Sequence, residues 1–307
     1  MIKLNFAGLL SFSDPLSTYI FWDLRLPRTL TAYLVGASLA VGGVVFQALF
    51  RNVLAAPFTL GVSSGAALGA SLALKFGLAG ALLGLPSSML WAFTGALATI
   101  VLVYFLGGGG RPGEQISLLL AGVVLSFFFS SLTLFVQYLS DFTELYQITH
   151  WLMGRLDMVG YSSLLLLLPF VAVGCLGALW LAPELDLMTL GDELALTRGV
   201  ALRRVRLTLY LTVSLMVAAV VSLCGVIGFI GVVVPYLCRA LIGPTHRRLI
   251  PAAFLGGGVF LLICDTVARS LMPPVEIPVG VVTALIGAPV FVWILLGARA
   301  KWAPSSW

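Results

Sequence analysis

Long, uninterrupted apolar runs dominate this sequence and decide what it can fold into. Of its 307 residues, 60% are hydrophobic and 9% are charged, whereas an ordinary soluble domain is about 45–50% apolar and about 25% charged. A helix needs about 20 apolar residues to cross a bilayer, and in lipid it satisfies every backbone N–H and C=O within itself. The sequence therefore predicts an all-α, polytopic membrane helical bundle. The runs are continuous and lack the alternation of an outer-membrane barrel.

Charged residues, prolines and glycines divide the apolar runs into nine predicted spans. They lie near residues 27–48, 57–76, 86–106, 116–138, 161–181, 203–223, 227–242, 249–271 and 278–297. The whole chain, 1–307, is then a single transmembrane domain. Gly61, Gly65 and Gly69 in the second span have the spacing that lets helix backbones approach closely. Packing within the subunit is favoured for these glycines over a role in a moving gate.

The distribution of Lys and Arg predicts the orientation. Counted on alternate sides of the spans, 11 of the 17 fall on the side that holds the loop 182–206 and the C-terminus. The positive-inside rule makes that side cytoplasmic, which leaves residues 1–22 as an external N-terminal segment. That segment has no apolar run of spanning length. A missing first helix, from a late start or a truncation, and a genuine nine-span form both stay open.

The sequence lacks the motifs of an enzyme. None of its three lysines follows the glycine of a GxxxxGK[ST] phosphate loop, and a nucleophile elbow, an HExxH helix and a paired-carboxylate site are also missing. We expect no catalytic residue, no metal site and no cofactor bound by this chain. The four cysteines lie scattered in apolar runs and are expected to be packing residues. The net charge of +5 fits basic residues on a cytoplasmic face better than a nucleic-acid partner.

Ionisable groups are rare in the middle of the spans. Asp265 and Arg269 lie four residues apart near the end of one span, where they are close enough to pair. Carriers driven by ion gradients generally need acidic groups near the membrane midplane. An ion-gradient-driven secondary transporter is therefore the alternative rather than the favoured interpretation, and the energy for transport is expected to come from another subunit.

The longest polar stretch on the predicted cytoplasmic side runs from 183 to 206. Asp192, or Thr189 just before Gly191, could cap a short helix from Glu193 to Arg198. Its acidic start and basic end suit the helix dipole. Such a helix between two spans would serve as a lever for a soluble partner, although an ordinary surface loop would fit the pattern equally well.

Several long blocks of the sequence are distinctive. The first is LRLPRTLTAYLVGASLAVGGVVFQALFRNVLAAPFTLGVSSGA (24–66), and LLLAGVVLS (118–126) and HWLMGRL (150–156) lie in the middle. Three further blocks cover 185–200, 225–251 and 264–296. In this order, from about residue 20 to the end, the blocks resemble the FecCD-type permeases, the membrane subunits of binding-protein-dependent ABC importers for iron–siderophore complexes, haem and cobalamin.

The resemblance implies ten spans per subunit, so the span lacking here would be the first. It also implies a homodimer or a pair of homologues in the bacterial inner membrane, in contact with lipid. Two ATP-binding cassette ATPase subunits would use ATP and Mg on the cytoplasmic side, and an external substrate-binding protein would deliver the cargo. Iron–siderophore complexes are the leading expectation for that cargo, with haem and cobalamin next.

Particular roles carry over by position in the family's motifs. Arg25, Arg28 and Arg269 would face outward and receive acidic residues of the binding protein, which suits the planar guanidinium fork. The turn at Glu114, Gln115 and Ile116 would lie near the inner gate, at the start of a pathway lined chiefly by 116–138. The cytoplasmic coupling segment, 183–202, would seat in the ATPase through Leu187, Thr189, Leu190, Gly191, Asp192, Glu193, Arg198 and Gly199.

The chain departs from the family pattern at three positions. Val53 and Ala56 replace a proline and an acidic residue in the first cytoplasmic turn, and Tyr236 replaces a histidine that often follows Pro235. Such changes are expected to alter local details, including the shape of the first cytoplasmic turn, and they leave the family resemblance intact.

Overall fold

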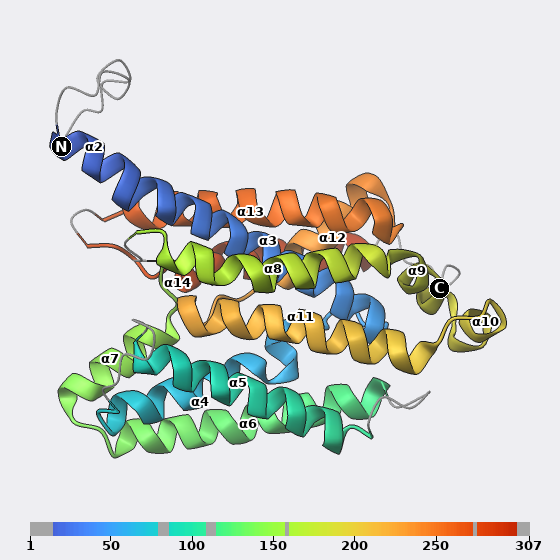
Figure 1. The fold of residues 1–307 in the computed structure, drawn as a ribbon, viewed down its shortest axis with the longest axis horizontal. Helices are drawn as coiled ribbons and strands as arrows, with labels where there is room; N and C mark the ends of the chain where they lie inside the picture. The colour runs from blue at the N-terminus through green and yellow to red at the C-terminus, as the bar shows by residue number, and fades with distance from the viewer. Residues whose placement is uncertain (1–14, 79–85, 109–114, 157–159, 273–274, 300–307) are drawn as a thin grey trace.

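The fold is a bundle of helices that lie side by side along the long axis of the molecule (Figure 1). The computed structural model describes residues 15–78, 86–108, 115–156, 160–272 and 275–299. Every regular element assigned in those ranges is helical, which confirms the all-α prediction. Most connections gather at the two ends of the bundle, with α2 and α7 at one end and α9 and α10 at the other (Figure 1).

The central helix is longer than the sequence predicts. α2 (Pro15–Tyr19), a π-helical turn η1 (Ile20–Arg25) and α3 (Leu26–Phe50) follow one another without a break. The predicted span 27–48 is therefore the buried part of a helix that begins inside the expected external segment 1–22. Residues 1–14 of that segment lie outside the described residues.

Eight of the nine predicted spans correspond to single apolar helices. The helix Ile20–Phe50, α5 (Ser87–Leu106), α6 (Gln115–Tyr138), α8 (Ser162–Trp180), α11 (Leu202–Cys224) and α13 (His246–Ser270) are long and apolar enough to cross a membrane. α12 (Ile230–Ile242) and α14 (Val279–Arg299) follow the two remaining runs. The pattern of apolar runs thus predicts the helices well.

The second predicted span, 57–76, is wrong as one continuous helix. A 3₁₀ turn, η2 (Pro57–Leu60), is followed by α4 (Val62–Lys75), and Gly61 between them has a left-handed φ of 79°. That conformation suits glycine and interrupts the helix. The 14 residues of α4 extend about 21 Å, which is less than the roughly 30 Å of a bilayer core.

Glycines let the helices of this bundle approach closely. A methyl group added at Gly36 of α3 would overlap the carbonyl oxygen of Gly257 in α13, and one added at Gly43 would overlap that of Gly231 in α12. α3 is buried along almost its whole length as a result.

The predicted glycine stripe of the second span has the same role in packing. Methyl groups at Gly65 and Gly69 would strike α5 at Thr99 and at the carbonyl oxygen of Trp91. The packing role is therefore confirmed for these two glycines. The four cysteines are buried, as expected of packing residues.

The helix α7 was not predicted. α7 (Phe142–Leu152) begins with a capping box in which the Asp141 carboxylate accepts from the Glu144 N–H at 2.8 Å and the Glu144 carboxylate accepts from the Asp141 N–H at 3.0 Å. The sequence DFTE carries that signal. The helix was overlooked because it is too short and too polar to cross a membrane.

Substituting Gly36 with alanine should destabilise the bundle, since the new methyl group has no room against the backbone of α13. Overpacking of this kind costs about 1–3 kcal/mol. Gly177→Ala in α8 is the matched control, because the nearest atom to its new methyl would be Thr212 Oγ1 at 3.7 Å. Thermal unfolding of the purified protein should show a lower Tm for Gly36→Ala only. Equal Tm values for the two variants would contradict the close α3–α13 contact.

Candidate functional site

Charged side chains are paired at both ends of the bundle. One end carries Arg25, Arg28 and Arg269 at the start of α3 and the end of α13, and is called the arginine end here. The other carries α9 (Ala182–Leu190) and α10 (Asp192–Thr197) and is called the α10 end. The family resemblance implies docking at the first end and coupling at the second, and Figure 1 shows the two ends far apart.

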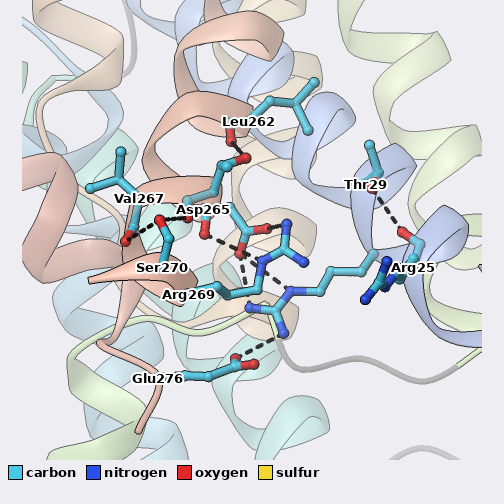
Figure 2. Close-up of polar contacts among 10 residues, drawn as sticks. Arg25, Thr29, Leu262, Asp265, Val267, Arg269, Ser270 and Glu276 are labelled. Atoms are coloured by element: carbon cyan, nitrogen blue, oxygen red, sulfur yellow. Dashed lines mark hydrogen bonds and ion pairs between the residues drawn. The ribbon is translucent and has the colours of Figure 1, made fainter. Parts of the chain in front are cut away.

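Asp265 is the centre of the arginine end. Its side chain is 1% exposed, and its Oδ1 accepts hydrogen bonds from Arg28 Nε at 3.3 Å and Nη2 at 2.9 Å. Its Oδ2 lies 3.0 Å from Arg269 Nη2, so the pairing expected from the four-residue spacing is present. One buried carboxylate of α13 therefore pairs with Arg28 of α3 and with Arg269 of its own helix, and the Arg28 pair joins α3 to α13 (Figure 2).

The remaining residues of this end are more exposed. Glu276, before α14, accepts from Arg28 Nη1 at 2.9 Å and is 52% exposed. Arg25 is exposed, and its carbonyl oxygen accepts from Thr29 Oγ1 at 2.7 Å. Figure 2 shows the Arg25 side chain apart from the Asp265 cluster. Of the three docking arginines predicted from the sequence, two are thus paired within the chain, and the docking role stays a prediction.

The α10 end contains the short helix that the sequence predicts at 193–198. α10 covers Asp192–Thr197, and Arg198 and Gly199, with a φ of 82°, end it. The suggested caps are wrong, because the residue before α10 is Gly191 and no side chain caps the helix. Thr189 instead bonds within α9, with its Oγ1 donating to the Asp186 carbonyl at 2.7 Å. α9 itself was not predicted.

Asp192 anchors α10 to two membrane helices. Both of its oxygens accept from Arg206 Nη2 of α11 at 2.7 Å, and Oδ1 also pairs with Arg51 at the end of α3. Arg51 Nε donates to the Met188 carbonyl of α9 at 2.9 Å. Partial burial disfavours ionisation of Asp192, but the hydrogen bonds and charges of Arg206 and Arg51 outweigh it and lower the pKa of this carboxyl. The ion pairs are therefore present at neutral pH and are lost only as pH falls through that lowered pKa.

A second carboxylate anchors α9. Asp186 Oδ1 accepts from the His246 backbone N–H at 2.9 Å and lies 2.6 Å from His246 Nδ1, at the first residue of α13. α9 and α10 are thus tied by polar contacts to α3, α11 and α13. Sequence reasoning singled out Asp192 but not Arg51, Arg206, Asp186 or His246.

The exposed surface of α9 and α10 carries three leucines, which are called the tip here. Leu190 is 71% exposed, and Leu194 and Leu196 are also exposed. Thr189, Glu193, Arg198 and Gly199 are exposed beside them, whereas Leu187 is half-buried. Exposed leucines rimmed by charged groups are the usual composition of a protein-binding surface.

Comparison with known proteins identifies the family. The model of the FecCD transport family matches residues 2–297. This chain belongs to the FecCD transport family. Among relatives of this FecCD chain, the hemin transport system permease protein HmuU of Yersinia pestis is 42% identical over 303 residues, covering 98% of this chain and 90% of the relative. The vitamin B12 import system permease protein BtuC of Klebsiella pneumoniae is 40% identical over 280 residues, covering 91% and 83%.

A solved structure has the same fold as this FecCD permease. It is an inward-facing conformation of a transporter classed as a metal-chelate type ABC transporter. The two chains are 37% identical, with a TM-score of 0.84 over 93% of this chain and 90% of the other. The family, its relatives and this fold place the chain among the permease subunits of ABC importers.

The predicted gate of this FecCD permease is described in part. Glu114 lies outside the described residues, and of Gln115 only its place as the first residue of α6 is described. Ile116 is 71% exposed. The start of α6 lies at the α10 end of the bundle (Figure 1), and its role near an inner gate stays a prediction. Among the described residues no group of three His, Cys, Asp or Glu side chains could hold a metal ion.

Substituting Asp192 with asparagine should loosen α10 without unfolding the bundle. Hydrogen bonds to a charged group contribute about 1.5–3 kcal/mol, so amide hydrogen exchange in 192–199 should become roughly tenfold faster or more. Glu193→Gln is the control, because Glu193 is the exposed neighbour of Asp192 in the same helix. Unchanged exchange in Asp192→Asn would show that the paired arginines do not hold α10.

Proposed function

We propose that this permease works as a dimer, with a second copy or a homologue, in the inner membrane of a bacterium. Two separate ATP-binding cassette subunits seat on the α10 end and hydrolyse ATP with Mg. An external substrate-binding protein docks on the arginine end. Alternating access, driven from the α10 end, then imports the cargo. The similarity to permeases of ABC transporters supports the general scheme.

The observation that carries this proposal is the anchoring of α9 and α10. Their exposed tip offers leucines to a partner, while their inner faces are held by Arg51, Arg206 and His246 to three helices of the bundle. A force on the tip is therefore passed directly to α3, α11 and α13. A freely hinged surface loop would not transmit it.

The pathway is proposed to run beside α6. This helix is the least buried of the six long apolar helices, with 17% of its most apolar stretch buried. Exposed residues continue along it, including Ile116, Val124, Phe127 and Phe135. A second copy packed near this face would enclose a wide path between two subunits, which suits a large cargo.

The proposed cargo is a metal chelate. Relatives of similar identity are named for hemin and for vitamin B12, which are metal complexes of large ring ligands. We keep iron–siderophore complexes as the first candidate, followed by haem and cobalamin. The alternative of an ion-driven carrier gains no support, since Asp265, a buried carboxylate in a spanning helix, is engaged with two arginines at one end of the bundle.

Charge reversal at Arg25 tests this function more cleanly than reversal at Arg28. Arg25 is exposed, whereas an acidic residue at 28 would face Asp265 and Glu276. We expect wild-type permease, assembled with its ATPase in proteoliposomes, to hydrolyse ATP faster when loaded binding protein is added. Arg25→Glu should remove most of that stimulation and Arg25→Lys should keep most of it, because a rim charge acts chiefly through association. Equal stimulation in all three would reject docking at this end.

A further inference from the structure

Both edges of the Arg28 guanidinium are occupied by carboxylates of this chain. On one edge, Asp265 Oδ1 accepts from Nε at 3.3 Å and from Nη2 at 2.9 Å. On the other, Glu276 Oε2 accepts from Nη1 at 2.9 Å. A guanidinium is planar and binds carboxylates along these edges. An acidic side chain that arrives from outside therefore has to take an edge that is already in use.

The two carboxylates differ in how easily they can leave. Asp265 is 1% exposed and also pairs with Arg269, so displacing its carboxylate from Arg28 would leave a buried charge without that partner. Glu276 is 52% exposed, and exposed ion pairs are weak. An incoming carboxylate can therefore displace Glu276 from its edge of the guanidinium, whereas Asp265 stays bound to the other edge.

The backbone holds Glu276 in front of Arg28. The next residue, Ile277, donates its N–H to the Ala268 carbonyl of α13 at 3.2 Å, and the preceding Val275 donates to the Met272 carbonyl at 2.8 Å. The charges of this cluster also balance, with Arg28 and Arg269 facing Asp265 and Glu276. The cluster presents net positive charge to a partner only when Glu276 has moved away.

We propose that Glu276 is an internal competitor for the Arg28 edge that receives an acidic side chain of the substrate-binding protein. Docking displaces Glu276, while Asp265 keeps the guanidinium oriented. Release of the binding protein lets Glu276 return, which limits the affinity of the docked complex. This inference rests on the proposed function, since it assumes docking at the arginine end.

The test compares Glu276→Gln with wild type in the complete complex of permease and ATPase in nanodiscs. The probe is the purified substrate-binding protein that stimulates ATP hydrolysis by the wild-type complex, and its Kd is measured at low and at high salt. Removing the competitor should lower the Kd about two- to fivefold, the factor that an exposed ion pair of ordinary strength yields. The same substitution in an Arg28→Gln background should have no effect. Asp265 keeps its pair with Arg269 in that background, so the bundle is expected to assemble.

Glu144→Gln is the matched control. It removes the same charge from the same end of the bundle, where Glu144 pairs with Lys75 at 2.7 Å instead of with Arg28. An unchanged or higher Kd in Glu276→Gln would overturn the proposal, as would an equal gain in Glu144→Gln or a gain that persists without Arg28. If the wild-type complex did not bind the substrate-binding protein at all, that result would reject the proposed docking and, with it, the role of Glu276.

Discussion

An unpaired charge is costly inside a lipid bilayer, and this cost determines where the charged side chains of the molecule lie. Among the described residues, the ion pairs of Arg28, Arg51, Arg206, His246 and Arg269 lie where α3, α11 and α13 begin or end, and the pair Lys75–Glu144 joins α4 to α7. Between the ends, close contacts at Gly36, Gly43 and Gly65 let the helices pack through small residues. Membrane helices gain little from burying apolar surface against one another, so backbone approach of this kind contributes much of their association.

The central helix connects the two ends physically. Arg28 lies near the start of α3 and Arg51 directly after its end, and each pairs with a carboxylate from a distant part of the chain. A buried pair is weak evidence for stability, because desolvation opposes the attraction. The pairs fix the positions of the helices relative to one another. On the proposed function, a displacement of α10 would be passed through Arg51 to the helix that carries Arg25 and Arg28 at the opposite end.

The sequence predicts what depends on local pattern. Continuous apolar runs predicted eight helices. The blocks that resemble FecCD-type permeases predicted the family, which the family model confirms. The ion pair of Asp265 and Arg269 was expected from their spacing of four residues. Gly61 was interpreted as a packing residue of the second span, although it lies between η2 and α4 and divides 57–76 into two elements.

The sequence could not predict ion pairs between residues that lie far apart in the chain. Arg206 and Asp192 are 14 residues apart, but Arg51 and Asp192 are 141 apart and Arg28 and Asp265 are 237 apart. A single sequence has no pattern that links such positions, because the helix packing brings them together. For the same reason, the sequence could not predict that Asp265 is buried whereas Glu276 is exposed.

The proposed function requires the arginine end and the α10 end to face opposite sides of the membrane. The four native cysteines are buried, so single added cysteines can report sidedness in sealed membrane vesicles. An impermeant maleimide should label Leu190→Cys only from the cytoplasmic side and Glu276→Cys only from the external side. Labelling of both positions from the same side, or of position 190 from outside, would contradict the account.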